Sequence, residues 1–212
     1  MGQQEVWPVV LLSTLLAAIG DHILLAYSAL LVSILLAVPL TLLMLYCRPA
    51  ARVIMPVTNL VQAVPSLAVV ALIVPLIGIG FYPAVIAIVL RALLPLVKNT
   101  WVGLVSIDPA EIDAANGLGL TRWEILRYIR APHALPPFFA GVRFAAILAN
   151  SLAVLTAIIG SGGLGSLVFE GLAGMNTVTL AAGAVPAILL ALTVDLLLGR
   201  AEQAVILRGI DD

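Results

Sequence analysis

Residues 53–90 run for 38 positions without a charged side chain. As one helix this stretch would be ~57 Å long at about 1.5 Å per residue, nearly twice the ~30 Å of hydrocarbon in a bilayer. A reversal is therefore needed, and Gly78-Ile79-Gly80, followed by Pro83, has the residues for one. The stretch predicts two membrane spans, near residues 57–77 and 82–97.

Three further stretches lack charged residues, and each is long enough to cross a bilayer. Hydrophobic residues make up 63% of the chain and charged residues 10%, a balance that a soluble domain of this size could not bury. Net charge −1 and a single cysteine exclude a nucleic-acid-binding surface and a disulfide scaffold. The sequence therefore predicts an all-α polytopic membrane protein with about five transmembrane helices, the other three near 23–46, 137–159 and 178–198.

The first 22 residues are expected to lie outside this domain. Residues 6–20 would cover only ~23 Å as a helix, so they predict an interfacial helix. The chain then divides into an extracytoplasmic or interfacial segment, 1–22, a membrane domain, 23–208, and a tail, 209–212. The alternative is a sixth span over residues 6–20, which would move the N-terminus to the other side.

The basic residues of the loops orient the domain. With five spans, one side holds only Glu5, Asp21 and Glu170 and no basic residue. Basic loops remain in the cytoplasm, so the N-terminus is predicted outside and the C-terminus in the cytoplasm. The basic loop residues that this orientation places on the cytoplasmic side are Arg48, Arg52, Lys98, Arg122, Arg127, Arg130, Arg200 and Arg208.

The only sizeable polar segment, the cytoplasmic loop 98–135, carries helix signals. Asp108-Pro109-Ala110-Glu111 has the form of an N-cap, and Asn116-Gly117 is expected to end that helix in a left-handed turn. Thr121-Arg122-Trp123-Glu124 is a capping box that opens a second helix, expected to stop before Pro132. These signals leave two alternatives open, a compact knob or an amphipathic loop on the lipid headgroups.

The loop resembles the EAA loop of ABC-importer membrane subunits. Asp113-Ala114-Ala115, three residues, Gly119, nine residues and Ile129-Arg130-Ala131-Pro132 follow the spacing of that motif, with Asp113 in place of Glu and Ala131 in place of Leu. The resemblance implies a coupling helix that docks into a groove of a partner ATPase. It implies coupling roles for Asp113, Ala114, Ala115, Gly119, Leu120, Ile129 and Pro132.

Shorter motifs are similar to importers of glycine betaine, choline and carnitine, among them 62–68, 75–80, 94–100, 140–143 and 158–165. The similarity covers about residues 23–208. It implies a type I ABC-importer permease in the bacterial inner membrane, with two ATPase subunits, a second permease subunit (the same or homologous) and an extracytoplasmic solute-binding protein. Methionine importers share the five-span size and a similar glycine-rich break, so they are the alternative.

The chain has no ATP site of its own. The only lysine, Lys98, follows Val97, whereas a P-loop needs Gly-Lys-Ser/Thr. No enzyme activity, catalytic residue, cofactor or metal site is predicted, and ATP-Mg is expected on the partner ATPase. Gly160-x-Gly162-x-x-Gly165 matches a dinucleotide fingerprint, but a membrane span precedes it instead of a strand. An outer turn or gate at Gly160, Gly162, Gly163 and Gly165 is predicted instead.

Polar residues within the spans have two possible roles, lining the solute path or forming interhelical hydrogen bonds. Asn59, Gln62 and Ser66 recur on one face of the second span, and Asn150 and Thr156 lie in the fourth. Arg91 is expected to reach the interface or to pair with a carboxylate such as Asp195.

No aromatic cage for a quaternary ammonium is evident, so a separate binding protein is expected to select the solute. An ion-driven secondary transporter would need more ionisable groups within the spans than Arg91, Arg143 and Asp195. A scaffold without transport is disfavoured by the proline-broken spans.

Overall fold

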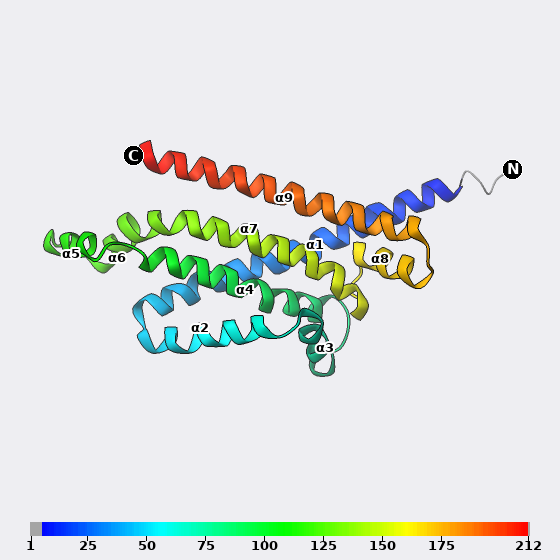
Figure 1. The fold of residues 1–212 in the computed structure, drawn as a ribbon, viewed down its shortest axis with the longest axis horizontal. Coiled ribbons are helices and arrows are strands. Elements are labelled where there is room, and N and C mark those ends of the chain that lie inside the picture. The colour runs from blue at the N-terminus through cyan, green and yellow to red at the C-terminus, as the bar shows by residue number, and fades with distance from the viewer. Residues whose placement is uncertain (1–5, 212) are drawn as a thin grey trace.

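The computed structural model describes the backbone of residues 6–211 and the side chains of residues 12–204, and in this part of the chain every regular element is helical. Figure 1 shows an elongated bundle. Its α-helices are α1 (Val6–Tyr46), α2 (Arg48–Ala63), α3 (Ser66–Ile77), α4 (Phe81–Val105), α5 (Pro109–Gly117), α6 (Arg122–Ile125), α7 (Ala131–Leu155), α8 (Leu164–Ala173) and α9 (Thr177–Asp211). A π-helical turn, η1 (Leu126–Arg130), precedes α7, and a 3₁₀ turn, η2 (Thr156–Ile159), follows it.

Four of the described helical segments are long and apolar enough to cross a membrane, and the bent pair α2–α3 brings the number to five. The four are Leu12–Tyr46, Phe81–Val105, Arg122–Ile159 and Thr177–Ala204. The predicted all-α fold with about five spans is therefore confirmed.

The predicted break near residue 22 does not occur, because α1 is one helix of 41 residues. At about 1.5 Å per residue it is ~62 Å long, more than a bilayer's hydrocarbon thickness. The expectation of a separate interfacial helix over 6–20 is therefore wrong. Gly20 and Asp21 do not end the helix, and the adjoining His22 is fully buried against neighbouring helices.

The second span is broken, not straight. Its two halves, α2 and α3, are bent by 104°. Val64 (ψ 131°) and Pro65 (ψ 138°) are extended, because a proline has no N–H and its ring disfavours helical backbone in the residue before it. The predicted single span over 57–77 is corrected to a helix that starts at Arg48 and breaks at residues 64–65.

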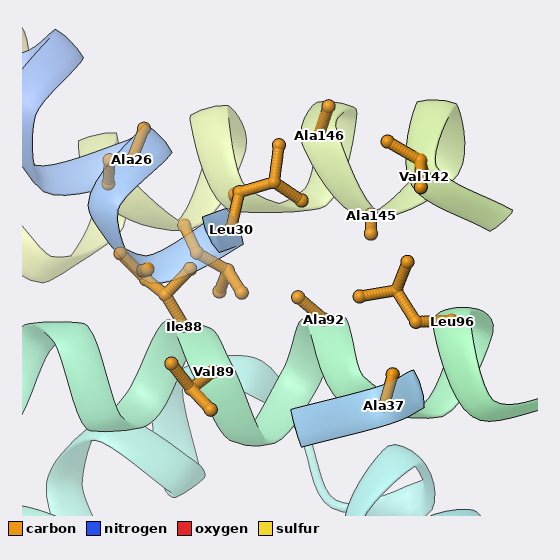
Figure 2. Packing of buried hydrophobic residues seen from close by; sticks show 14 of the residues in the cluster. Ala26, Leu30, Ala37, Ile88, Val89, Ala92, Leu96, Val142, Ala145 and Ala146 are labelled. Carbon is orange, nitrogen blue, oxygen red and sulfur yellow. The ribbon is translucent and has the colours of Figure 1, made fainter. Parts of the chain in front are cut away.

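The core forms where α1, α4 and α7 pack together. Figure 2 shows small side chains at these contacts, among them Ala37 of α1, Ala92 of α4 and Ala145 of α7. Each of the three is fully buried. Small residues allow membrane helices to approach closely, and close packing is the main attraction between helices in lipid. α9 packs against α7 and α8, while α2 and α3 pack against α4.

The two ends of the bundle carry different elements (Figure 1). One end gathers the α1–α2 turn, α5, α6 and the C-terminal end of α9. The other gathers α3, α8 and the start of α1. The α1–α2 turn and the segment from α5 to α6, which carry basic residues, therefore lie at the same end. The side of the membrane that this end faces stays a prediction. The helix α9 continues to Asp211, so residues 209–211 of the expected tail are helical, and residue 212 lies outside the described part.

Candidate functional site

The loop between α4 and α7 begins with the predicted N-cap. Asp108 precedes α5, and its Oδ1 accepts a hydrogen bond of 2.8 Å from the backbone N–H of Ala110. Pro109 occupies the first helical position, where its missing N–H costs nothing. The segment with the Asp-Ala-Ala motif is thus a short, well-capped helix, as predicted.

A Schellman motif ends α5, and its left-handed residue is Gly119. The N–H of Leu120 donates to the carbonyl of Ala115 (3.1 Å), and the N–H of Gly119 donates to that of Asn116 (3.0 Å). The φ of Gly119 is +82°, where other L-residues are strained. The expected left-handed turn at Asn116-Gly117 is therefore wrong by two residues, because Gly117 is still helical.

The predicted capping box after Gly119 is present. Glu124 accepts a hydrogen bond of 2.7 Å from the N–H of Thr121, while the Thr121 hydroxyl accepts one of 3.3 Å from the N–H of Glu124. The helix does not stop before Pro132, however. It passes through η1 into α7, because the wider π turn accommodates a proline, which lacks an N–H. α6, η1 and α7 therefore form one continuous helical rod.

The loop is anchored to the bundle on one side. Leu126 is buried with Leu104 and Ala134, against Leu42 and Leu45 of α1. Arg130 donates to the carbonyl of Leu104 in the last turn of α4. The anchoring fixes the loop relative to both α1 and α4.

The opposite side of the loop is exposed and is not packed against the bundle. Leu118 is 81% exposed and Trp123 is 64% exposed. The residues of the predicted motif divide between the two sides. Ala115 is buried, Leu120 and Ile129 are half-buried, and Asp113, Ala114, Gly119 and Pro132 are exposed.

The predicted path residues of the second span do not share one helix face. Asn59 and Gln62 belong to α2, whereas Ser66 is the first residue of α3, beyond the 104° bend. Asn59 is exposed, and the other two are half-buried. Gln62 Nε2 lies 3.5 Å from the carbonyl oxygen of Arg91, at the limit of a hydrogen bond.

Asn150 and Thr156 lie inside the subunit. Asn150 Nδ2 donates to the carbonyl of Ala187 in α9 (3.0 Å), and its Oδ1 lies 3.2 Å from Nε2 of His22 in α1. Thr156 donates to the carbonyl of Ala153 (3.2 Å) and accepts from the Ser161 hydroxyl (3.0 Å). For these two residues the observed bonds fit the structural alternative, with Asn150 bridging three helices.

Arg91 does not pair with Asp195. Its Nη1 donates to the carbonyls of Val61 (3.2 Å), Gln62 (2.9 Å) and Val64 (2.8 Å), which the helix break leaves without α-helical partners. Buried carbonyls without partners are costly in lipid, so Arg91 stabilises the end of α2. The sequence signal for this role of Arg91 was Pro65, because a helix break at a proline leaves backbone carbonyls that need a hydrogen-bond donor.

Asp195 pairs with Arg143 instead. Arg143 Nη2 lies 2.9 Å from Asp195 Oδ1, and its Nη1 lies 3.0 Å from Glu202 Oε2. This triad ties α7 to α9, a link that sequence reasoning missed. The spacing of the two carboxylates, seven residues apart on one helix face, was the available signal.

The glycine-rich segment after η2 is a turn, as predicted. The φ angles of Gly160, Gly162 and Gly163 are +77°, +77° and +74°. A Cβ on Gly165 would lie 2.2 Å from the carbonyl oxygen of Val154, so only glycine fits where α8 starts against α7. A helical turn precedes the segment, not the strand that a dinucleotide site requires.

The structure is thus a bundle of membrane-length helices with a well-capped loop, one side of which is exposed. Residues 29–207 match the family described as binding-protein-dependent transport system inner membrane component, and the chain belongs to this family. The resemblance to ABC-importer membrane subunits and the multi-pass inner-membrane location are thereby confirmed.

The similar curated proteins are permeases too. The chain is 35% identical to the carnitine transport permease protein OpuCB of Listeria monocytogenes, over 89% of this chain and 86% of the relative. It is 37% identical to the osmoprotectant import permease protein OsmW of Salmonella typhimurium, over 90% and 91%. Among solved structures, the inward-facing MetNI methionine ABC transporter superposes with a TM-score of 0.82 at 19% identity, over 97% of this chain and 99% of that one.

Proposed function

We propose that this chain forms, with a second permease subunit, the translocation path of an ABC importer for an osmoprotectant of the glycine betaine, choline or carnitine type. The observation that carries the proposal is the 34–37% identity, over most of both chains, to permeases of choline, carnitine and osmoprotectant systems. The methionine system supports only the fold, because its identity is 19%. A methionine permease is therefore the less supported alternative.

The proposed assembly contains two ATPase subunits, two permease subunits and an extracytoplasmic binding protein. Hydrolysis of ATP-Mg belongs to the ATPase subunits, since no Gly-Lys-Ser/Thr motif occurs in this sequence. The chain itself is then a non-enzymatic conduit without a cofactor. The proposed permease domain covers residues 23–208, the range of the sequence similarity, although its first helix begins earlier, at Val6. The coupling loop lies at its cytoplasmic end.

The proposed mechanism uses the rod formed by α6, η1 and α7. A closing ATPase would push the exposed side of the loop, at Leu118 and Trp123, and the rod would carry that displacement into the bundle. The Arg143 triad would make α9 follow α7. This argument supports the coupling roles proposed for Asp113, Ala114, Ala115, Gly119, Leu120, Ile129 and Pro132.

The proposed solute path passes the bend of the second span. Asn59, Gln62 and Ser66 would contact the solute there, and broken helices are common at the solute sites of transporters. Asn150 and Thr156 would support the wall from within through their internal hydrogen bonds. The turn containing Gly160, Gly162, Gly163 and Gly165 is proposed as an outer gate.

Uptake by the reconstituted complex tests the function. Radiolabelled glycine betaine, choline or carnitine should enter proteoliposomes only when ATP is inside and the loaded binding protein is outside. An imposed sodium or proton gradient without ATP should drive no uptake, since Arg91, Arg143 and Asp195, the ionisable groups that a secondary transporter would use, are held in structural contacts. Gradient-driven uptake would instead establish the secondary-transporter alternative.

Topology reporters test the orientation. A reporter fused after Arg208 should give a cytoplasmic signal, and one inserted near Gly174, between α8 and α9, an extracytoplasmic signal. Alkaline phosphatase and green fluorescent protein fusions measure the two sides. The reverse pair of signals would overturn the orientation and the coupling role of the loop with it.

A further inference from the structure

Two adjoining clefts lie between the α1–α2 turn and the segment from α5 to η1. Their volumes are about 300 and 410 Å³, and both are lined by Leu45, Arg48 and Arg130. Arg122 lines the first cleft and Arg52 the second. Four arginines, from both sides of the space, therefore line these two clefts, which together we call the basic cleft.

The basic cleft has cations without counter-charges. No Asp or Glu lines either part of it. Among the side chains described, residues 12–204, Arg48, Arg52 and Arg122 have no ion-pair partner, and Arg130 is bound only to the carbonyl of Leu104. The ion-paired Arg143 differs in this respect. Cations gathered in a cleft concentrate anions there.

Three helix ends border the cleft, and one of them is the start of α2. Cys47, the N-cap residue, provides no side-chain hydrogen bond to the first turn, and Arg48 is the first helical residue. The positive end of the α2 dipole borders the cleft together with the negative C-terminal ends of α1 and α4, so the arginine side chains and not the helix dipoles supply the positive potential.

One wall of the cleft is apolar. Met44, Leu45, Trp101 and Val105 line the larger part, from the ends of α1 and α4 that carry the basic loops. On the outer sides of the same two helices, Leu43 is 50% exposed and Val102 is 48% exposed, as expected of lipid-facing residues. The cleft thus lies where the apolar part of two membrane helices meets a cluster of arginines.

We propose that the basic cleft binds the phosphate headgroup of an anionic phospholipid of the cytoplasmic leaflet. A phosphate diester matches the guanidinium groups in charge and hydrogen bonding, and the acyl chains match the apolar wall. A free phosphate ion would use the arginines but not that wall. A bound lipid would bridge Arg48 and Arg52 to Arg122 and Arg130, so it would tether the coupling loop to the first span.

Photocrosslinking in the assembled importer tests this site. The complex is placed in phosphatidylcholine nanodiscs that contain a trace of one photoreactive lipid, with a diazirine near its headgroup. This lipid is either a phosphatidylglycerol or a phosphatidylcholine. The labelled peptides are mapped by mass spectrometry. Labelling at residues 43–52 and 101–105 should favour phosphatidylglycerol by at least about fivefold, the factor that one basic residue near the surface supplies. Equal labelling by the two lipids would overturn the proposal.

Matched variants separate this site from general surface charge. Arg48→Gln combined with Arg52→Gln should lower phosphatidylglycerol labelling at least about fivefold and leave phosphatidylcholine labelling unchanged. Arg200→Gln, at an exposed arginine of α9 outside the cleft, should change neither. If the double variant does not assemble, Arg122→Gln replaces it. Loss of labelling in Arg200→Gln to the same extent would contradict a specific site.

Two further experiments identify what occupies the basic cleft. Inorganic phosphate, added against chloride at constant ionic strength, should leave the labelling unchanged, and full displacement would show that a soluble anion is the ligand. Labelling should also persist in the complete complex. Labelling seen only after the ATPase subunits are removed would show that protein, not lipid, covers the cleft.

Discussion

A transporter complex with Gly119→Asp should insert at the normal level but import solute only at the background rate. Gly119 closes the Schellman motif with a φ of +82°, which strains an L-residue by about 1–2 kcal/mol. No other atom lies within 4 Å of the position its Cβ would take, so the bundle itself should tolerate the substitution. The added carboxylate would project where the ATPase is proposed to dock. Solute uptake and co-purification of the ATPase measure the effect.

Gly117→Ala is the matched control. Gly117 is the last residue of α5, has no atom within 4 Å of an added Cβ and does not have a positive φ. Alanine is favoured over glycine in a helix by up to ~1 kcal/mol, so uptake should be retained. Wild-type uptake by Gly119→Asp, at equal expression, would mean that this loop does not transmit the power stroke.

Local chemistry explains why much of the loop was predictable. An N-cap and a capping box involve residues within three positions of one another, as Asp108 with Ala110 and Thr121 with Glu124 show. The number of spans was predictable for a similar reason, since hydrophobicity over about 20 residues decides whether a helix can cross a bilayer.

Errors arose where the sequence leaves more than one option open. Gly117 and Gly119 can both adopt a left-handed conformation, and the bonds back to Ala115 and Asn116 select the second. Pro132 would normally end a helix. Because Leu126 is anchored in the bundle, the chain continues through a π turn instead.

Pairing of charges across helices was the least predictable feature. Arg91 and Arg143 are both basic residues inside spans, and either could have met Asp195. The bend at Pro65 presents free carbonyls to Arg91, while the packing of α9 on α7 presents Asp195 and Glu202 to Arg143. Pro65 and the spacing of Asp195 and Glu202 are local signals, but neither says which arginine meets them. The same holds for Asn150, whose partners His22 and Ala187 are on two other helices.

Solute selection by a separate binding protein predicts a second large effect. Recognition of a trimethylammonium group by cation–π attraction needs aromatic rings arranged around one point. Within residues 12–204, the aromatic pairs in contact are sequence neighbours, Phe81–Tyr82 and Phe138–Phe139. The amides and hydroxyl proposed for the path, Asn59, Gln62 and Ser66, offer polar contacts without such a cage. The complex without its binding protein should therefore show little ATPase stimulation by free solute.

ATP hydrolysis by the purified complex, with and without loaded binding protein, tests the proposed function most directly. Binding protein loaded with glycine betaine, choline or carnitine should stimulate the ATPase several-fold, and free solute or the binding protein of a methionine system should not. Strong stimulation by free solute alone would place the selective site in the membrane subunits. Stimulation by the methionine-loaded protein in place of the osmoprotectant-loaded one would contradict the osmoprotectant assignment.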